Sequence, residues 1–329
     1  FQAEDGIRDR SPSRGLGDVY KRQVYIERLL NRARHVEIQI LCDSHGGAIH
    51  LNERDCSLQR RYQKVIEEAP SPAVDPELRQ AMGAAAVKAA ESVGYEGAGT
   101  VEFLLSSRGE FYFLEMNTRL QVEHPVTEMT TGIDLVLKQF EIAAGLPLGI
   151  IQADVGLSGH AIEARVYAED ASRGFLPCVG RLATWKTPQG PGIRVDSGVR
   201  QGDAITIDFD PMLAKLIVHA PTRRAALRRL DTALSDLIAL GVTTNIGFLR
   251  DAAAHQAFTT GSVTTDFLDS SDISGFSHTE VEPTVLVAVA CAAQRLGLER
   301  VPSDGGMGAL DEHTGHPGDP FRTLTRSFP

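Results

Sequence analysis

The chain has 329 residues, a formal net charge of −10, 42% hydrophobic residues and 23% charged residues. Its length suits about two globular domains, and no apolar run approaches the roughly 20 residues of a membrane-spanning helix. The acidic balance argues against a general nucleic-acid binder, because such proteins carry a basic surplus. We therefore expect neither a membrane nor a nucleic acid as a partner.

The first 23 residues are expected to be a non-native leader. They are rich in Arg, Gly, Asp and Ser, and they lack hydrophobic periodicity and the apolar core of a signal peptide. Back-translation of residues 2–9 and 13–23 gives a sequence that resembles a sequencing-library adapter. We therefore expect the native reading frame to begin near Val24.

From Val24 to about residue 150, strand-like and helix-like patterns alternate. Apolar runs bounded by turn residues predict strands, and apolar residues at helical spacing that end at glycine predict helices. The predicted elements are strands at 36–42 and 48–51 and helices at 78–93 and 134–144. We interpret residues 24–150 as the first domain.

Turn residues cluster between positions 145 and 159, and we place a domain boundary there. Residues 151–268 form the expected second domain. Residues 269–329 differ in composition and are interpreted as a linker and the start of a further module. The predicted elements of the second domain are strands at 161–167, 180–187 and 212–219 and an amphipathic helix at 223–240, whose arginines are expected to face solvent.

The four cysteines are scattered and show no Cys-x-x-Cys spacing. A structural zinc site or a disulfide framework is therefore not expected. Buried free thiols in a reducing cytoplasm are the expected state. The cysteines are Cys42, Cys56, Cys178 and Cys291.

The segment at 113–125 alternates polar and apolar residues with the two-residue period of an extended strand. Carboxylates can hold a divalent cation and a guanidinium can hold an anion, so its polar face fits a metal-bound anion. The alternative is an antiparallel strand with one solvated face, which shows the same alternation. The polar face comprises Glu115, Asn117, Arg119, Gln121 and Glu123.

A further carboxylate, Glu102, lies on the preceding strand-like run, and a turn signal joins the two runs into a hairpin. We expect Leu105 to pair with Glu110. Glu102 then opposes Phe113, and Glu115 is its diagonal neighbour on the same face. Such neighbours lie about 7–8 Å apart, within reach of one shared divalent ion. A one-residue slip would place the two acids on opposite faces.

Basic residues at 54–64, which end with Lys64, form a local island in an acidic chain. A solvated loop and a contact to a nucleotide phosphate or another anion both fit this pattern. His35 precedes a strand and Arg194 follows a glycine-rich turn. Residue type alone favours structural or surface roles for both.

Taken together, these motifs resemble biotin carboxylase. The resemblance extends from about Val24 to Leu268, with the motifs in the family's order. It implies an α+β chain: the C-terminal lobe of an ATP-grasp fold, followed by the biotin carboxylase C-terminal domain. The motifs include RHVEIQI at 34–40, GYEGAGTVEF at 94–103, FLEMNTRLQVEHPVTE at 113–128 and GHAIEARVYAED at 159–170.

The resemblance implies a ligase that carboxylates biotin with bicarbonate and ATP, through carboxyphosphate, using Mg²⁺ or Mn²⁺. Glu123 would be the general base, and the other implied catalytic residues are Arg119, Arg194 and Lys64. The implied bicarbonate contacts are Arg119, Gln121 and the Val122 backbone. The implied metal contacts are Glu102, Glu115 and Asn117, and the implied nucleotide contacts are Glu27, Leu30, His35 and Gln59.

Two positions depart from the family pattern. Arg28 stands where many relatives have lysine, and Tyr62 stands where several have histidine. The family's N-terminal domain and most of its glycine-rich lid would precede Val24. We therefore expect that this chain does not turn over ATP by itself.

The residues beyond Leu268 favour an acyl-CoA carboxylase α subunit over a free-standing subunit, because residues 319–322 resemble the start of that subunit's linker. The expected partners are a biotin carboxyl carrier domain, a carboxyltransferase subunit and a second copy in a homodimer. The alternatives are a pyruvate-type or urea-type carboxylase and a non-catalytic nucleotide-binding module. The sequence leaves open which acyl-CoA is carboxylated.

Overall fold

The computed structural model describes residues 28–270, in which strands predominate over helices. The strands of the main sheet are β1 Arg34–Cys42, β2 Ala48–Arg60, β3 Gln63–Ala69, β4 Gly97–Leu105, β5 Phe111–Asn117, β6 His160–Tyr167, β11 Ile193–Ser197 and β13 Met212–Ala220. The helices are α2 Pro76–Ser92, α3 His124–Thr131, α4 Leu135–Ala143, α5 Arg223–Asp236, α6 Ile246–Ala254, α7 Gln256–Thr259 and α8 Phe267–Ser270, with short 3-10 turns at Gln152–Asp154 and Ala171–Arg173.

One antiparallel sheet of eight strands organises the described residues, in the order β11-β13-β6-β3-β2-β1-β4-β5. β3 pairs with β6, so the sheet continues from the part before residue 151 into the part after it. Three two-stranded sheets flank it: β7 Glu169–Asp170 with β8 Leu176–Pro177, β9 Gly180–Arg181 with β12 Ala204–Ile205, and β10 Thr184–Lys186 with β14 Ile238–Leu240.

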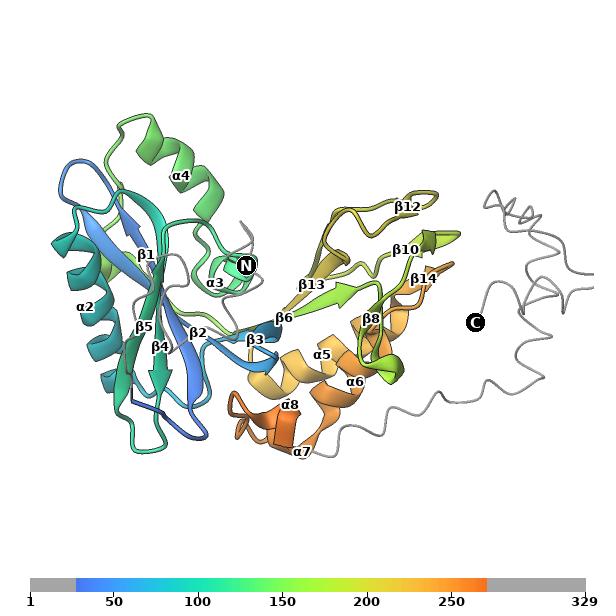
Figure 1. Cartoon of the computed structure of the whole chain (residues 1–329). Coiled ribbons are helices and arrows are strands. Elements are labelled where there is room, and N and C mark those ends of the chain that lie inside the picture. Colours follow the sequence, from blue (N-terminus) through green and yellow to red (C-terminus); the bar gives the residue numbers. More distant parts are fainter. Residues whose placement is uncertain (1–27, 271–329) are drawn as a thin grey trace, which may run out of the picture.

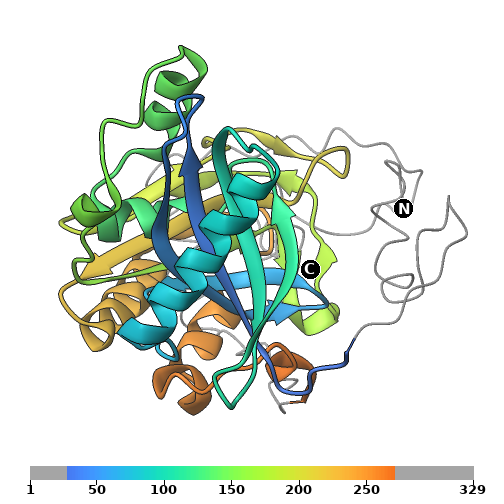
Figure 2. The same ribbon diagram turned by 90° about the vertical axis from the view of Figure 1, so that its left-hand side faces the viewer.

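Helices cover both faces of the main sheet (Figure 1). α2 crosses one face of β1 and β4, with Met82 and Ala86 packed among alternate strand residues such as Ile38 (Figure 2). α5 and α6 cover β6 and β13 through a separate apolar cluster. α3 lies on the other face, where Val126 packs on Ile217. The face covered by α3 carries the polar residues described below.

Two predicted helices begin within two residues of their expected first positions. Asp75 accepts a hydrogen bond from the Leu78 backbone N–H (2.8 Å) and caps α2, with Pro76 at the first helical position. Asp134 caps α4 in the same way through Leu137. The helices predicted at 78–93 and 134–144 are therefore confirmed.

Four expectations about the elements are wrong. The strand predicted at 48–51 is much longer, because β2 continues to Arg60. The helix predicted at 223–240 ends at Asp236, and the next residues form β14. The strand predicted at 180–187 is two strands, β9 and β10. The segment at 113–125 is extended only to Asn117, and α3 begins at His124 because Pro125 suits the first helical turn.

The arginines of α5 do not all face solvent. Arg223 donates to both carboxylate oxygens of Glu68 on β3 (2.7 and 3.0 Å), and Glu68 also contacts His160 (2.7 Å). Arg229 donates to the His219 carbonyl. These two arginines therefore contact the sheet, whereas Arg224 and Arg228 are exposed.

The cysteines within the described residues are free thiols. Cys42 and Cys56 are buried, as expected, and Cys178 is partly exposed. Cys291 lies outside the described residues. None of the helices described between residues 28 and 270 combines the length and the apolar character needed to cross a membrane.

Two glycines with similar backbone angles test how closely β6 and β13 approach each other. Gly159 (φ +68°) precedes β6, and a Cβ there would lie 2.6 Å from the Ala220 carbonyl oxygen, whereas Gly132 (φ +75°) has open space around it. Gly132→Ala should cost about 1–2 kcal/mol for the left-handed conformation alone. Gly159→Ala should cost about 1–3 kcal/mol more, because backbone must also move. Urea unfolding of both variants measures the difference, and equal losses would contradict the close approach.

Candidate active site

A row of charged side chains crosses four neighbouring strands on the α3 face of the sheet. In the strand register, Arg54 on β2 lies opposite Glu37 on β1, and Glu37 lies opposite Glu102 on β4. Glu102 in turn lies opposite Glu115 on β5. Directly opposed residues project from the same face of an antiparallel sheet, with Cβ atoms about 4.5–5.5 Å apart. The sheet register therefore gathers three carboxylates beside one guanidinium.

The β4–β5 hairpin reaches this arrangement by a register that differs from the expected one. Leu105 pairs with Phe111 instead of Glu110, a slip of one residue, and Phe113 pairs with Phe103 instead of Glu102. A β-bulge compensates for the slip, because Leu114 has no partner in the ladder. Glu115 thereby returns to the α3 face directly opposite Glu102. The predicted shared face is confirmed, and the predicted diagonal geometry is wrong.

Lys64 on β3 connects three carboxylates of the site. Its Nζ lies 2.5 Å from Glu37, 3.0 Å from Glu102 and 2.5 Å from Glu123. A second bulge explains this position, since the β2–β3 register shifts between Leu58 and Gln59. The two residues after Lys64 both pack into the apolar core under α5 and α6, so Lys64 and Glu67 share the α3 face.

The close cations keep these buried acids ionised. Burial alone would raise the pKa of Glu37, but Lys64 and Arg54 lower it to about 2. Burial likewise opposes ionisation of Glu102, but His35, 3.1 Å away, and Lys64 hold its pKa well below the ordinary range. Burial would lower the pKa of Lys64, but Glu37 and the other acids raise it well above its ordinary value.

Arg54 is fully buried, and all five of its N–H groups have acceptors. Nε donates to Glu37 (2.6 Å), and the two terminal nitrogens donate to four further oxygens. Those acceptors are Gln39 (2.6 Å), Thr127 (3.0 Å), Thr100 (3.1 Å) and Gln121 (2.9 Å). Arg54 thus joins β1, β2, β4, the loop before α3 and α3 itself.

The loop before α3 brings two predicted residues back to the sheet. Gln121 donates to Glu102 (2.7 Å) while it accepts from Arg54. Glu123 immediately precedes α3, where the helix dipole favours a carboxylate, and Arg165 on β6 donates to it (2.9 Å). Glu123 therefore lies between two cations, Lys64 and Arg165.

The outer part of the site is more exposed. Asn117 donates to Glu115 (3.5 Å), and Arg119 donates to the Asn117 side-chain oxygen (3.2 Å). Glu115 and Arg119 are exposed, whereas Glu102 and Gln121 are buried. The site therefore has a buried floor and an open rim, with carboxylates and an amide placed as divalent cations prefer.

Arg194 lies beside the site instead of within this network. It donates to Asp196 (2.8 and 2.9 Å) and to Glu128 on α3 (2.7 Å), and these partners raise its pKa. Lys215 on β13 donates to the Val122 carbonyl (2.5 Å) and lies 3.6 Å from Asp196. Val122 is thus linked to Arg194 through Lys215 and Asp196.

The predicted nucleotide contacts lie at the edge of this network. His35, two residues before Glu37, contacts Glu102, and Gln59 is buried opposite Lys64 in the β2–β3 pairing. Leu30 is partly buried in the segment before β1. Glu27 lies outside the described residues.

The basic island is a strand hairpin. Its turn places Arg61 and Tyr62 at positive φ (48° and 68°). Arg60 lies over the Phe175 ring, 3.8 Å from its centroid, and pairs with Glu169 (3.3 Å). Three of its cations, Arg54, Arg60 and Lys64, are therefore engaged within the protein. Arg28, one of the departures from the family pattern, donates to the Tyr112 hydroxyl (2.7 Å).

Sequence reasoning missed four charged residues of the site: Arg54, Glu37, Arg165 and Glu67. Each lies within a strand whose neighbouring residues are buried. The signal was present, because a charged residue that alternates with core residues in a strand must be paired within the protein.

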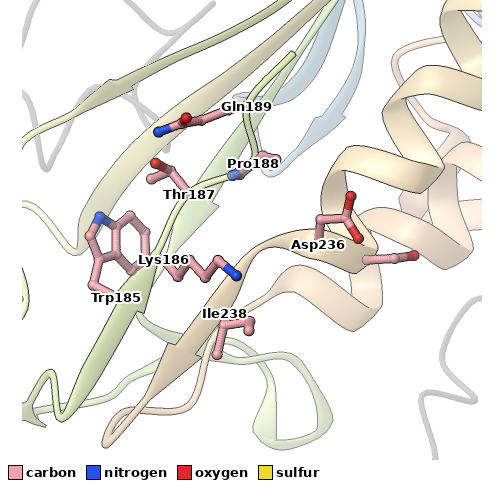
Figure 3. A pocket seen from close by; sticks show the side chains of 8 residues that line it. Trp185, Lys186, Thr187, Pro188, Gln189, Asp236 and Ile238 are labelled. Carbon is pink, nitrogen blue, oxygen red and sulfur yellow. The ribbon is translucent and has the colours of Figure 1, made fainter.

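A surface pocket of about 700 Å³ lies elsewhere, between β10, β14 and the end of α5. Trp185, Lys186 and Asp236 are among its lining residues (Figure 3). None of the predicted site residues lines it. The acid–base network on the α3 face is therefore the candidate active site.

Comparison with known proteins shows the family to which the chain is similar. Residues 11–151 match the family model described as carbamoyl-phosphate synthase L chain, ATP binding domain, and residues 163–270 match the biotin carboxylase C-terminal domain. The mitochondrial propionyl-CoA carboxylase alpha chain of Caenorhabditis elegans is 48% identical over 306 residues, 91% of this chain and 42% of that protein. Biotin carboxylase 2 of Bacillus subtilis is 53% identical over 245 residues, 74% of this chain and 55% of that protein.

Among solved structures, the biotin carboxylase domain of Hydrogenobacter thermophilus 2-oxoglutarate carboxylase, in complex with MgADP and bicarbonate, is similar. It has 45% identity and a TM-score of 0.73, and the match covers 74% of this chain and 54% of that one. The fold and these matches define an ATP-grasp ligase architecture. The chain belongs to the biotin carboxylase family, and it spans about half the length of the relatives that it matches.

The buried guanidinium of Arg54 should contribute far more to the free energy of unfolding than an exposed guanidinium does. Arg54→Met leaves Glu37 without its Nε–H donor and four other acceptors unpaired, and it should lower the free energy of unfolding by about 3–5 kcal/mol. The matched control is Arg250→Met, which removes an exposed pair with Asp231 (3.0 Å) and should cost less than about 1 kcal/mol. Equal losses in urea unfolding would contradict the role of Arg54.

The low pKa of Glu37 predicts a specific loss of stability in acid. Because the folded pKa is about 2 and the ordinary value is 4.5, the contribution is present above about pH 4.5 and is lost as the pH falls toward 2. The stability difference between wild type and Glu37→Gln should therefore shrink over this range, by on the order of 3 kcal/mol. Glu141→Gln, a partly exposed control, should show little change, and a constant difference for Glu37→Gln would refute the shift.

Proposed function

We propose that this chain forms part of an enzyme that carboxylates biotin, using ATP and bicarbonate through carboxyphosphate. The observation that carries the proposal is the single network in which Lys64 contacts Glu37, Glu102 and Glu123. Such a network offers a base, cations for phosphate and bicarbonate oxygens, and carboxylates for a divalent ion. Phosphoryl transfer needs these groups, because its catalysis consists mainly of positioning and charge stabilisation.

Glu123 is proposed as the general base that removes the proton of bicarbonate. It is 2% exposed, and the cations Lys64 and Arg165 on either side fix its two oxygens. Arg119, Gln121 and the Val122 backbone are proposed to hold bicarbonate, since they lie on the turn that leads to Glu123. A guanidinium and an amide can hold a carboxylate-like anion at two points.

Glu102, Glu115 and Asn117 are proposed to hold Mg²⁺ or Mn²⁺, which would screen the phosphates of ATP. The donor set fits, because two carboxylates face each other across β4–β5 and the amide follows on β5. Leu30, His35 and Gln59, together with Glu27, are proposed to contact the nucleotide. Arg194 is proposed to stabilise the deprotonated, anionic form of biotin, and its connection to Val122 through Asp196 and Lys215 supports this role.

The extent of the matches favours an acyl-CoA carboxylase α subunit. Similarity to the propionyl-CoA carboxylase chain covers 91% of this chain, whereas similarity to the bacterial biotin carboxylase covers 74%. The additional similarity is what a shared extension beyond the carboxylase domain would produce. A pyruvate-type or other biotin-dependent carboxylase would use the same site and is the alternative.

A biotin carboxyl carrier domain and a carboxyltransferase subunit are the proposed partners, with a homodimer as the proposed assembly and the cytoplasm as the proposed location. The named H. thermophilus structure is of a domain dimer, and the named relative is an alpha chain. Free Cys42 and Cys56 suit a reducing compartment. Because this chain spans about half of each relative, turnover is proposed to require the rest of that length.

Replacement of Glu123 by glutamine tests the proposed base. In the complete carboxylase polypeptide that contains this chain, Glu123→Gln should reduce bicarbonate-dependent ATP cleavage with free biotin by at least about 100-fold. Glu110→Gln, on the exposed hairpin turn, is the matched control and should leave the rate unchanged. Normal turnover by Glu123→Gln would remove the assignment.

A further inference from the structure

Glu163 lies in the middle of β6 on the α3 face, and none of the proposed roles uses it. Its side chain is fully buried, and neither carboxylate oxygen has a hydrogen-bond partner among the described residues. Glu67 lies directly opposite on β3, is also fully buried, and has one oxygen, Oε2, in the same condition. Two directly opposed strand residues therefore carry three buried acceptor oxygens that have no donor among the described residues.

Two directly opposed and fully buried carboxylates cannot both stay ionised without a large cost. A single proton resolves the conflict, because it neutralises one acid and supplies an O–H donor for the other. The pKa shifts agree: burial and the neighbouring Glu67 raise the pKa of Glu163 well above its ordinary value, and burial raises that of Glu67 to about 7.

Four charged groups face this pair from the surrounding segments. They are Arg165 on β6, Lys215 on β13, Lys64 on β3 and Glu123 before α3. From α3 itself, Val126 and Met129 pack on the neighbouring apolar residues of β6 and β13. α5 and α6 pack on the opposite face of β6 through an apolar cluster.

Arg165 joins the pair to the proposed base. Its Nε donates to Glu67 Oε1 (2.6 Å), and its Nη2 donates to Glu123 Oε2 (2.9 Å). One guanidinium is therefore divided between two carboxylates. Any change in the charge of Glu67 alters how strongly Arg165 attracts Glu123.

We propose that Glu67 and Glu163 share one proton in the folded protein, and that through Arg165 this pair sets the proton affinity of Glu123. The second half rests on the proposed function, because it assumes that Glu123 is the base. Both acids are positioning residues, since they act through Arg165 and touch no substrate.

The effect on the reaction follows from the charge on Arg165. With one proton on the pair, Glu67 remains negative and offsets the pull of Arg165 on Glu123, so Glu123 accepts the bicarbonate proton readily. A second proton, taken up as the pH falls through about 7, neutralises Glu67. The guanidinium of Arg165 then attracts Glu123 more strongly, because an ionised Glu67 no longer competes for it. Glu123 becomes a weaker base.

Infrared spectroscopy of the chain itself tests the shared proton. At about pH 8, where ordinary carboxyl groups are ionised, wild type should show the carbonyl-stretch band of a protonated carboxyl group. Glu163→Gln should lack this band, and the surface control Glu141→Gln should keep it. A wild type without the band, or a band that persists in Glu163→Gln, would overturn the proposal.

The pH profile of kcat in the complete carboxylase tests the link to Glu123. Glu67→Gln removes the negative charge beside Arg165, so the acid limb should move to lower pH by about one unit and the maximum should fall about tenfold. A lower maximum with an unmoved acid limb would mean that Glu67 is merely structural.

The two measurements separate this inference from the proposed function. If the chain shows the infrared band but the complete carboxylase polypeptide shows no bicarbonate-dependent ATP cleavage, the shared proton would be upheld and the proposed function removed. An active enzyme without the band would uphold the proposed function and remove the shared proton.

Discussion

The ammonium group of Lys64 is the interaction on which the site depends. It brings together carboxylates from β1, β4 and the residue before α3, which are far apart in the sequence. Glu37 and Glu102 are directly opposed, and like charges in that position repel. Without a cation between them, the β1–β4 pairing would place two buried negative charges side by side. The cation that stabilises the sheet is thus also placed to hold anions.

The hairpin illustrates what the sequence could and could not predict. The two-residue period correctly placed Glu102 and Glu115 on one face, because side-chain alternation follows directly from strand geometry. The register was one residue wrong, since turn residues alone did not reveal where pairing begins. The bulge at Leu114 then reversed the consequence of that slip, and nothing in the local composition indicated it. The position of a bulge depends on which side chains the whole sheet must bury, and these are set by other strands.

The segment after Asn117 shows the opposite case. Its alternation predicted an extended strand through Glu123, but the chain turns and starts α3. Gln121 and Glu123 nevertheless reach the same network, because the turn directs them back toward Arg54 and Lys64. The grouping of these side chains was thus predicted better than the backbone conformation that produces it. Pro125 was the local signal for a helix start, and the regular alternation concealed it.

The residues that sequence analysis missed share one property. Arg54, Glu67 and Arg165 lie inside strands, where pairing partners come from other strands and cannot be found by spacing. Buried charges of this kind add little net stability, so their concentration on one face of the sheet favours a role in chemistry. The opposite face of β1 and β4, under α2, is an ordinary apolar core.

The central claim is that the sheet presents the carboxylates of Glu102 and Glu115 together as a site for a divalent ion. Anomalous X-ray scattering from crystals of the chain grown with Mn²⁺ tests it most directly. A manganese peak should appear with oxygen atoms of both carboxylates about 2.1 Å away. A peak bound elsewhere, with these two carboxylates free of metal, would contradict it.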